Sequence, residues 1–212
     1  MEALLSTTYF GPIEWYQKLY RAEHVVIEQW ESFQKQTYRN RCLIATTQGV
    51  QALTVPVVRG DSPLLKDTRI SDHGNWRHLH WNALQSAYGE SPFFEYYQDD
   101  IRPFFERPRK FLLDFNEAIR ERICELIDIN PNISLTTEYT PSTFHIPHST
   151  FRLPPSTMVD FRATINPKHP LPDPDFEPKP YYQVYQQKHG FLPNLSILDL
   201  LMNMGPESIL FL

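Results

Sequence analysis

Short apolar runs and one amphipathic segment alternate along the first 60 residues. Each run is bounded by polar or turn-forming residues, as is typical of strands. The four runs are 3–5, 25–27, 43–45 and 52–55. Between the first two, residues 12–22 open on a proline and place most of their apolar side chains on one face, which predicts a helix. The last two runs flank Thr47-Gln48-Gly49, which favours a hairpin. The order predicts a βαβ-like unit followed by a hairpin.

The spacing of apolar positions changes to a helical period in residues 72–129. A first helix is expected from Trp76 to Tyr88, with Asn75 as its N-cap and Gly89 as its terminator. Ser91-Pro92 opens a second helix in the same way. Apolar residues then recur at helical spacing over 111–129, which predicts a third. This part of the chain is therefore a central helical segment.

Proline dominates the next part of the chain. Ten prolines between 141 and 180 exclude a central strand or a long helix there. We expect an extended arm that lies over the surface. Six apolar residues could anchor it: Phe144, Phe151, Leu153, Val159, Phe161 and Ile165. A final helix begins at Asn194 as its cap and stops at Gly205-Pro206. The sequence thus predicts an α/β fold in one domain over 1–212, with 141–180 as an arm.

Composition and charge narrow the class of protein. Hydrophobic residues make up 41% of the 212 residues, enough for a substantial core. The formal charge of −5 argues against a nucleic-acid partner. The two cysteines form no disulfide framework, and the N-terminus resembles no secretory signal. Because no stretch approaches the ~18 consecutive apolar residues of a membrane span, we expect a cytoplasmic protein.

Three segments carry a resemblance to a known family. They are Lys35-Gln36-Thr37-Tyr38-Arg39-Asn40-Arg41, then Asn75-Trp76-Arg77-His78-Leu79-His80 with Ser91–Tyr97, then 191–208, which reads FLPNLSILDLLMNMGPES. In order and spacing they resemble the WbqC-like protein family over most of residues 4–208. The last segment is the most specific of the three.

The resemblance implies a setting more than a reaction. Members occur in bacterial gene sets for O-antigen and other surface polysaccharides. Together with the basic segment at 35–41, this setting leads us to expect a transferase-like enzyme for a small anionic substrate, which is a sugar phosphate, nucleotide or nucleotide-sugar. Many members begin with a strand followed by H-Q-P-N-Y-L-P-W, similar to the phosphate-binding loop of nucleotidyltransferase-like folds. Here Ser6–Pro12 keeps Tyr9 and Pro12 but lacks the histidine.

The basic segment at 35–41 suggests an anion site. If residues 33–45 are extended, Lys35, Arg39 and Arg41 share one strand face, while Tyr38 and Asn40 share the other. Three cations on one face repel each other unless an anion lies among them, and arginine suits phosphate or carboxylate. The alternatives are a solvated edge strand or salt bridges to acidic helices.

Other polar residues are candidates by their place in the motifs. His80 matches the family pattern and is suited to general acid/base work, or is a hydrogen-bonded helix histidine beside Trp76. Asp199 and Asn203, four apart on one helix face, form a buried pair or point into a pocket. The predicted catalytic residues are His80 and Asp199. The predicted substrate-binding residues are Tyr9, Lys35, Tyr38, Arg39, Asn40, Arg41, Trp76, Asn194 and Asn203.

The sequence predicts neither a metal site nor a cofactor. His78 and His80 point in different directions on a helix, and His145 and His148 have no third ligand at a suitable spacing. A second class of function stays open: a scaffolding protein whose proline- and aromatic-rich arm docks on a partner or on a second copy of the chain. A nucleic-acid binder that uses 35–41 is a third.

Overall fold

Four parallel strands form the central sheet of the computed structural model, which describes residues 1–58, 60–141 and 158–212. Their order is β7-β2-β1-β8. The bounds are β1 (Glu2–Ser6), β2 (His24–Glu28), β7 (Ile133–Leu135) and β8 (Met158–Asp160). Helix α1 (Ile13–Arg21) connects β1 to its parallel neighbour β2, so the predicted βαβ-like unit is confirmed.

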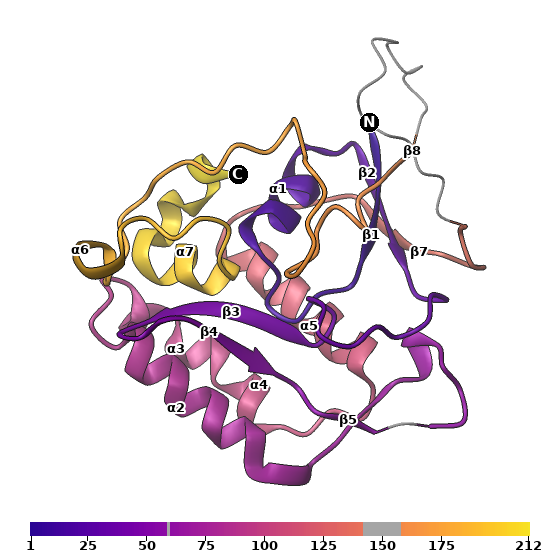
Figure 1. Cartoon of the computed structure of the whole chain (residues 1–212), viewed down its shortest axis with the longest axis horizontal. Coiled ribbons are helices and arrows are strands. Elements are labelled where there is room, and N and C mark those ends of the chain that lie inside the picture. Colours follow the sequence, from indigo (N-terminus) through magenta and orange to yellow (C-terminus); the bar gives the residue numbers. More distant parts are fainter. Residues whose placement is uncertain (59, 142–157) are drawn as a thin grey trace.

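The predicted hairpin is also confirmed. Strands β3 (Arg41–Thr46) and β4 (Gly49–Thr54) pair antiparallel along their whole length, from Arg41 opposite Thr54 to Thr46 opposite Gly49. In Figure 1 the hairpin crosses the middle of the molecule, with α2 and α3 below it and α7 above it. Beyond it, β5 (Val57–Val58) and β6 (Arg69–Ile70) form a second small ribbon.

Helices occupy the central segment where the sequence predicts a helical period, and two further α-helices lie within residues 186–204. They are α2 (Trp76–Tyr88), α3 (Phe94–Ile101), α4 (Pro103–Glu106), α5 (Leu112–Leu126), α6 (Gln186–His189) and α7 (Ile197–Met204). Three 3₁₀ helices cover Leu65–Asp67, His73–Asn75 and Gly205–Phe211. Within the described parts of the chain, none of these helices is long and apolar enough to cross a membrane.

Two predicted helix caps differ from the structure. Asn75 directly precedes α2, but its backbone is left-handed (φ 49°) and its side chain makes no capping bond. Asn194 does not cap α7. Ser196 holds that position, and its hydroxyl accepts a hydrogen bond from the Leu198 amide at 3.3 Å. The reason is that Asn194 uses its side chain at the start of α1 instead.

Aromatic rings fill the space between the loop after β1 and the helices beneath the hairpin. Tyr9 and Phe10 are fully buried in that loop. The Tyr9 ring stacks on Phe115 with centroids 5.8 Å apart, and Phe10 stacks on Phe105 at 6.1 Å. Each such pair adds roughly 0.5–1.5 kcal/mol to the burial of its rings. This packing fixes the loop that leads from the end of β1 into α1.

Residues 158–180 of the arm pack against α1. The Lys18 ammonium forms a buried ion pair with Asp173 at 2.5 Å and lies 4.7 Å from the ring centre of Phe161. Two of the predicted anchors, Phe161 and Ile165, are buried. Three others, Phe144, Phe151 and Leu153, lie outside the described residues.

Candidate functional site

The carboxyl ends of the parallel strands meet at one edge of the sheet. From β1 the chain continues through α1 to β2 on one side, whereas β8 pairs with β1 on the other side. In open parallel sheets, ligands bind outside the carboxyl ends at such a reversal of strand order. Ser6 and Asp160 end the two strands that flank this point.

A hollow of about 710 Å³ opens at this edge. We call it the sheet-edge hollow. Its lining residues are Trp30, Glu31, Ser32, Gln34, Arg39, Tyr139, Arg162, Ala163, Asn166, His169 and Leu171. A small recess beside it is lined by the end of β1, Tyr38 and Phe161, and it shares Arg39 and Arg162 with the hollow. The two arginines therefore join the end of β1 to the larger space.

Arg39 is held by a two-point ion pair. Its Nε and Nη2 donate to the two carboxylate oxygens of Glu31 at 2.8 and 2.6 Å, and Nη2 also donates to the Ser6 hydroxyl at 2.8 Å. The Asn116 amide donates to the Arg39 carbonyl at 2.8 Å, which fixes the backbone. This geometry is rigid because the fork of a guanidinium matches a carboxylate.

Arg162 forms the second fixed group. Its Nε and Nη2 donate to the carboxylate of Asp160 at 2.9 and 2.6 Å, and Nη1 lies 3.6 Å from Glu28 Oε2. Burial lowers the pKa of Arg162, but the hydrogen bonds and charge of Asp160 outweigh it and raise the pKa. Glu28 is fully buried and accepts hydrogen bonds from Thr136 Oγ1 and the Thr140 amide, both at 2.8 Å. The network thus ties β2, β8 and the segment after β7 together.

The charges on the floor of the hollow nearly balance. In the described residues, three carboxylates, those of Glu28, Glu31 and Asp160, face two guanidinium groups, which leaves the network one charge negative. Of these groups, Glu31, Arg39 and Arg162 line the hollow, whereas Glu28 and Asp160 do not. Such groups offer both donors and acceptors to hydroxyl groups. At the rim, Trp30 and Tyr139 add aromatic surface. The described floor therefore suits a hydroxyl-rich group better than a multiply charged anion.

Cations lie nearer the mouth of the hollow. The Lys66 ammonium is 4.6 Å from the centre of the Trp30 ring and also pairs with Asp67 at 3.1 Å. Lys168 contacts the side chain of Gln36, which brings the loop around Lys35 next to the loop that carries His169. Lys35 and Lys168 are both exposed. An anionic group of a ligand would find its counter-charges here.

The N-terminus of α1 is closed to an anion. The Ile13 amide donates to the Leu195 carbonyl at 3.0 Å, and the Glu14 amide donates to Asn194 Oδ1 at 3.0 Å. Asn194 Nδ2 in turn donates to Glu14 Oε2 at 2.8 Å. Because the segment before α7 occupies these first-turn donors, the loop from Ser6 to Pro12 does not present them as a phosphate site.

The predicted strand face of three cations is wrong. Residues 35–39 form turns and a bend, and β3 begins only at Arg41. Lys35 is consequently exposed, Arg39 turns inward to Glu31, and Arg41 donates to Thr54 Oγ1 at 3.0 Å. Asn40 is buried, and its side-chain amide donates a hydrogen bond to the Val55 carbonyl at 2.8 Å. Of this motif, Tyr38 and Arg39 line the sheet edge, and Lys35 lies near its mouth.

Tyr9, Trp76 and His80 form a separate cluster. The Tyr9 hydroxyl lies 2.9 Å from His80 Nδ1, and the rings of Trp76 and His80 are 5.1 Å apart. Burial lowers the pKa of His80 to about 4, and a backbone hydrogen bond at Thr54 only partly opposes this. His80 is therefore neutral at pH 7. The catalytic role that the sequence predicts for it stays a prediction.

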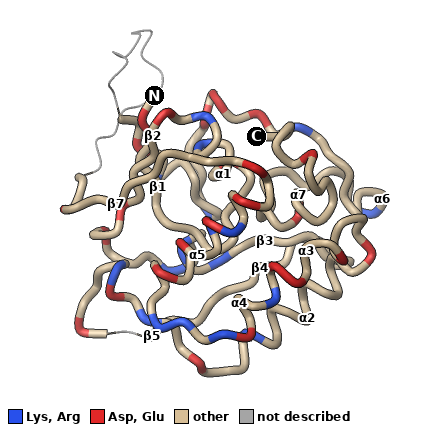
Figure 2. The backbone as a smooth tube through the Cα atoms, turned by 180° about the vertical axis from the view of Figure 1, so that it is seen from behind, with Lys and Arg blue, Asp and Glu red and all other residues tan. Residues whose placement is uncertain are grey.

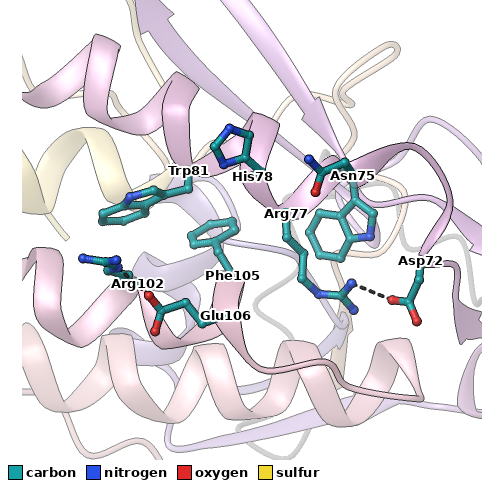
Figure 3. Close-up of a pocket in the computed structure, with 9 residues that line it drawn as sticks. Asp72, Asn75, Arg77, His78, Trp81, Arg102, Phe105 and Glu106 are labelled. Atoms are coloured by element: carbon teal, nitrogen blue, oxygen red, sulfur yellow. Dashed lines mark hydrogen bonds and ion pairs between the residues drawn. The ribbon is translucent and has the colours of Figure 1, made fainter.

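A second pocket, of about 300 Å³, lies beside this cluster between α2 and α4 (Figure 3). It shares no lining residue with the sheet-edge hollow. Trp76, Trp81 and Phe105 provide its aromatic wall. Its charges are paired, Arg77 with Asp72 at 2.5 Å and Arg102 with Glu106 at 2.5 Å. The predicted residues are thus dispersed: some line the sheet edge or lie at its mouth, others line this pocket or lie beside it, and the remaining five line neither, namely Asn40, Arg41, Asn194, Asp199 and Asn203.

Asp199 and Asn203 are buried in α7. Asp199 Oδ2 accepts hydrogen bonds from the Tyr181 hydroxyl at 2.6 Å and from Gln183 Nε2 at 2.9 Å. Burial raises the pKa of Asp199, and these hydrogen bonds oppose the rise. Asn203 donates to the Asp199 carbonyl at 2.7 Å. The Asp199 side chain thus holds the chain around Tyr181 against α7, whereas the Asn203 side chain bonds within α7 itself. The functional roles predicted for both residues remain predictions.

Four residues of the sheet edge were not singled out by the sequence: Glu28, Glu31, Asp160 and Arg162. Glu28 directly follows the apolar run 25–27, and a polar residue at the end of a buried parallel strand is a usable signal. Arg162 lies among prolines and carried no such signal. In the described residues, no group of three or more His, Cys, Asp or Glu side chains could hold a metal ion.

Comparison with known proteins places the chain in a family. The model of the WbqC-like protein family matches residues 7–153 and 174–210, so Asp160 and Arg162 lie between the two matched stretches. The uncharacterized protein Rv1507c of Mycobacterium tuberculosis is 24% identical over 219 residues, which cover 97% of this chain and 94% of that protein. No solved structure matches. The chain belongs to the WbqC-like protein family.

Proposed function

We propose that this protein is a transferase-like enzyme whose substrate binds in the sheet-edge hollow. The substrate class is a sugar phosphate, nucleotide or nucleotide-sugar, used in bacterial surface polysaccharide or O-antigen synthesis. The observation that carries the proposal is the meeting of Arg39 and Arg162 at the reversal of strand order, where both line one hollow of about 710 Å³.

We infer how the parts of such a substrate would lie in the hollow. Sugar hydroxyls fit the floor, because the carboxylates and guanidinium groups around Arg39 and Arg162 are fixed and nearly balanced in charge. A sugar or base ring fits against Trp30 or Tyr139 at the rim. A phosphate fits near the mouth, where Lys35 and Lys168 are exposed.

Ligand-induced stabilisation tests this proposal. Thermal shift and calorimetry would compare nucleotide-sugars, nucleoside diphosphates, sugar phosphates and neutral sugars. A ligand at about 100 times its Kd stabilises a fold by about 2.7 kcal/mol. We expect a nucleotide-sugar or a sugar phosphate to bind more tightly than the neutral sugar. Only the phosphorylated compounds can contact both the floor and the mouth of the hollow.

Rim variants show whether binding uses the hollow. Tyr139→Ala and His169→Ala remove exposed side chains and change no charged group of the buried network. Tyr139→Ala also removes the ring that lies 5.9 Å from the Arg162 guanidinium, so His169→Ala is the cleaner of the two variants. Each should weaken binding at least about tenfold if it removes one good contact. Tyr96→Ala, which removes a tyrosine that is 75% exposed on α3, is the matched control. The proposal fails if no probe stabilises the wild type, or if the rim variants bind as well as Tyr96→Ala.

A further inference from the structure

A row of exposed cations lies along one edge of the molecule, away from the sheet-edge hollow. It comprises Arg69 in β6 and Arg107, Arg109 and Lys110 in the segment between α4 and α5. The two segments run side by side, because Arg69 forms an antiparallel bridge with Phe111 and the Ile70 amide donates to the Lys110 carbonyl at 3.0 Å. Blue segments gather along this edge near β5 in Figure 2. We call it the basic edge.

The charges of the basic edge are not neutralised. Among the residues that the structure describes, none of these four cations forms an ion pair. Arg77 and Arg102, by contrast, are each paired with a carboxylate. In a chain of net charge −5, a local row of unpaired cations creates a positive surface. Such a surface attracts an anionic partner within about a Debye length, roughly 10 Å at 0.1 M salt.

Apolar side chains lie among these cations. Val58 pairs with Arg69 in the β5–β6 ribbon and is 49% exposed. Phe111 is half-buried, with Arg69 and Lys110 at 5.8 and 5.2 Å from its ring centre. An apolar group flanked by cations is typical of surfaces that lie on anionic membranes, where each Lys or Arg near the surface adds to the attraction.

We propose that the basic edge docks this protein on an anionic lipid bilayer. Phosphate headgroups would lie against the four cations, and Val58 would enter the boundary between headgroups and acyl chains. A nucleic acid fits less well, because stacking of bases requires an open aromatic face and the Phe111 ring already carries two cations. The inference does not rest on the proposed function, because none of these residues lines the hollow.

Vesicle sedimentation with the full chain tests the docking. The probes are vesicles of phosphatidylglycerol and phosphatidylcholine in equal parts, and vesicles of phosphatidylcholine alone. We expect binding to the first and not to the second, with affinity falling as salt rises. Arg107→Glu with Arg109→Glu should lower the affinity at least roughly tenfold, because two attractive charges become repulsive.

A matched variant separates this surface from net charge. Lys179→Glu with Lys188→Glu makes the same change in net charge at exposed sites elsewhere. It should bind vesicles as the wild type does. The proposal is overturned if the wild type ignores anionic vesicles at low salt, or if both double variants lose binding equally. Binding of a DNA duplex that depends on Arg107 and Arg109, without binding of vesicles, would also overturn it.

Discussion

Arg39 and Glu31 form a two-point ion pair at the carboxyl end of β1, and both side chains are buried. The pair joins the turn before β3 to the segment after β2, so it also fixes one wall of the sheet-edge hollow. Burying a charge without a counter-ion is costly. Each of these two buried charges is therefore stabilised by the other.

Removal of one partner should therefore destabilise the fold strongly. We expect Glu31→Leu to lower the free energy of unfolding by about 3–5 kcal/mol, because Arg39 then keeps a buried charge without its carboxylate. The double variant Glu31→Leu/Arg39→Met should cost clearly less than the sum of the single variants. Urea denaturation of all four proteins measures the coupling. Additivity within about 0.5 kcal/mol would contradict the ion pair.

His80 should make stability depend on pH on the acid side. Its folded pKa of about 4 lies below the ordinary value of 6.5. The stability that it contributes is therefore fully present above pH 6.5 and is lost as pH falls towards 4. The full shift corresponds to roughly 3 kcal/mol. We expect the free energy of unfolding of a His80→Phe variant to depend less on pH between pH 4 and pH 8 than that of the wild type. Urea denaturation at a series of pH values measures this. Parallel curves for the variant and the wild type would count against a neutral buried His80.

Glu14 should act in the opposite sense. Burial raises its folded pKa from 4.5 to about 7, with the Asn194 hydrogen bond and Lys18 opposing the rise and Asp173 adding to it. Its contribution to stability is therefore complete below pH 4.5 and is lost as pH rises through 7. Glu14→Gln, which keeps an acceptor for Asn194, should remove this loss and gain stability relative to the wild type at pH 8. A variant that is less stable than the wild type at pH 8 would refute this.

Asn194 should stabilise α1 although it lies 180 residues further along the chain. Asn194→Ala removes the side-chain oxygen that accepts from the Glu14 amide and places alanine at a backbone φ of 51°. We expect a loss of about 1 kcal/mol from the cap and a further strain from the left-handed backbone. Asn194→Gly should be less harmful, because glycine tolerates that φ. Asn130→Ala, at an exposed asparagine, is the control, and thermal unfolding measures the stability of both variants. If Asn130→Ala lost as much stability as Asn194→Ala, the result would argue against the cap.

Local pattern predicted the first four strands and the five described helices of eight or more residues, but not β5 to β8. The hairpin from Arg41 to Thr54 follows from two apolar runs around a turn, and α2 and α5 follow from their helical periods. These features depend on neighbours in sequence, which share a strand face or a helix face. The same reasoning failed for Lys35 and Arg39, because it assumed an extended backbone where the chain turns.

The sequence by itself thus determined the first βαβ unit and the hairpin, the helical centre, the last helix and the family. It did not indicate β7 and β8, which form the two edges of the central sheet. Only the tertiary structure decided which polar groups meet. Arg39, Glu28 and Arg162 come from distant segments, and they converge because the parallel strands end at one edge of the sheet. Asn194 likewise closes the start of α1, because the fold places the segment before α7 against the first turn of α1. Neither contact has a local signature, because each depends on the packing of segments far apart in the chain.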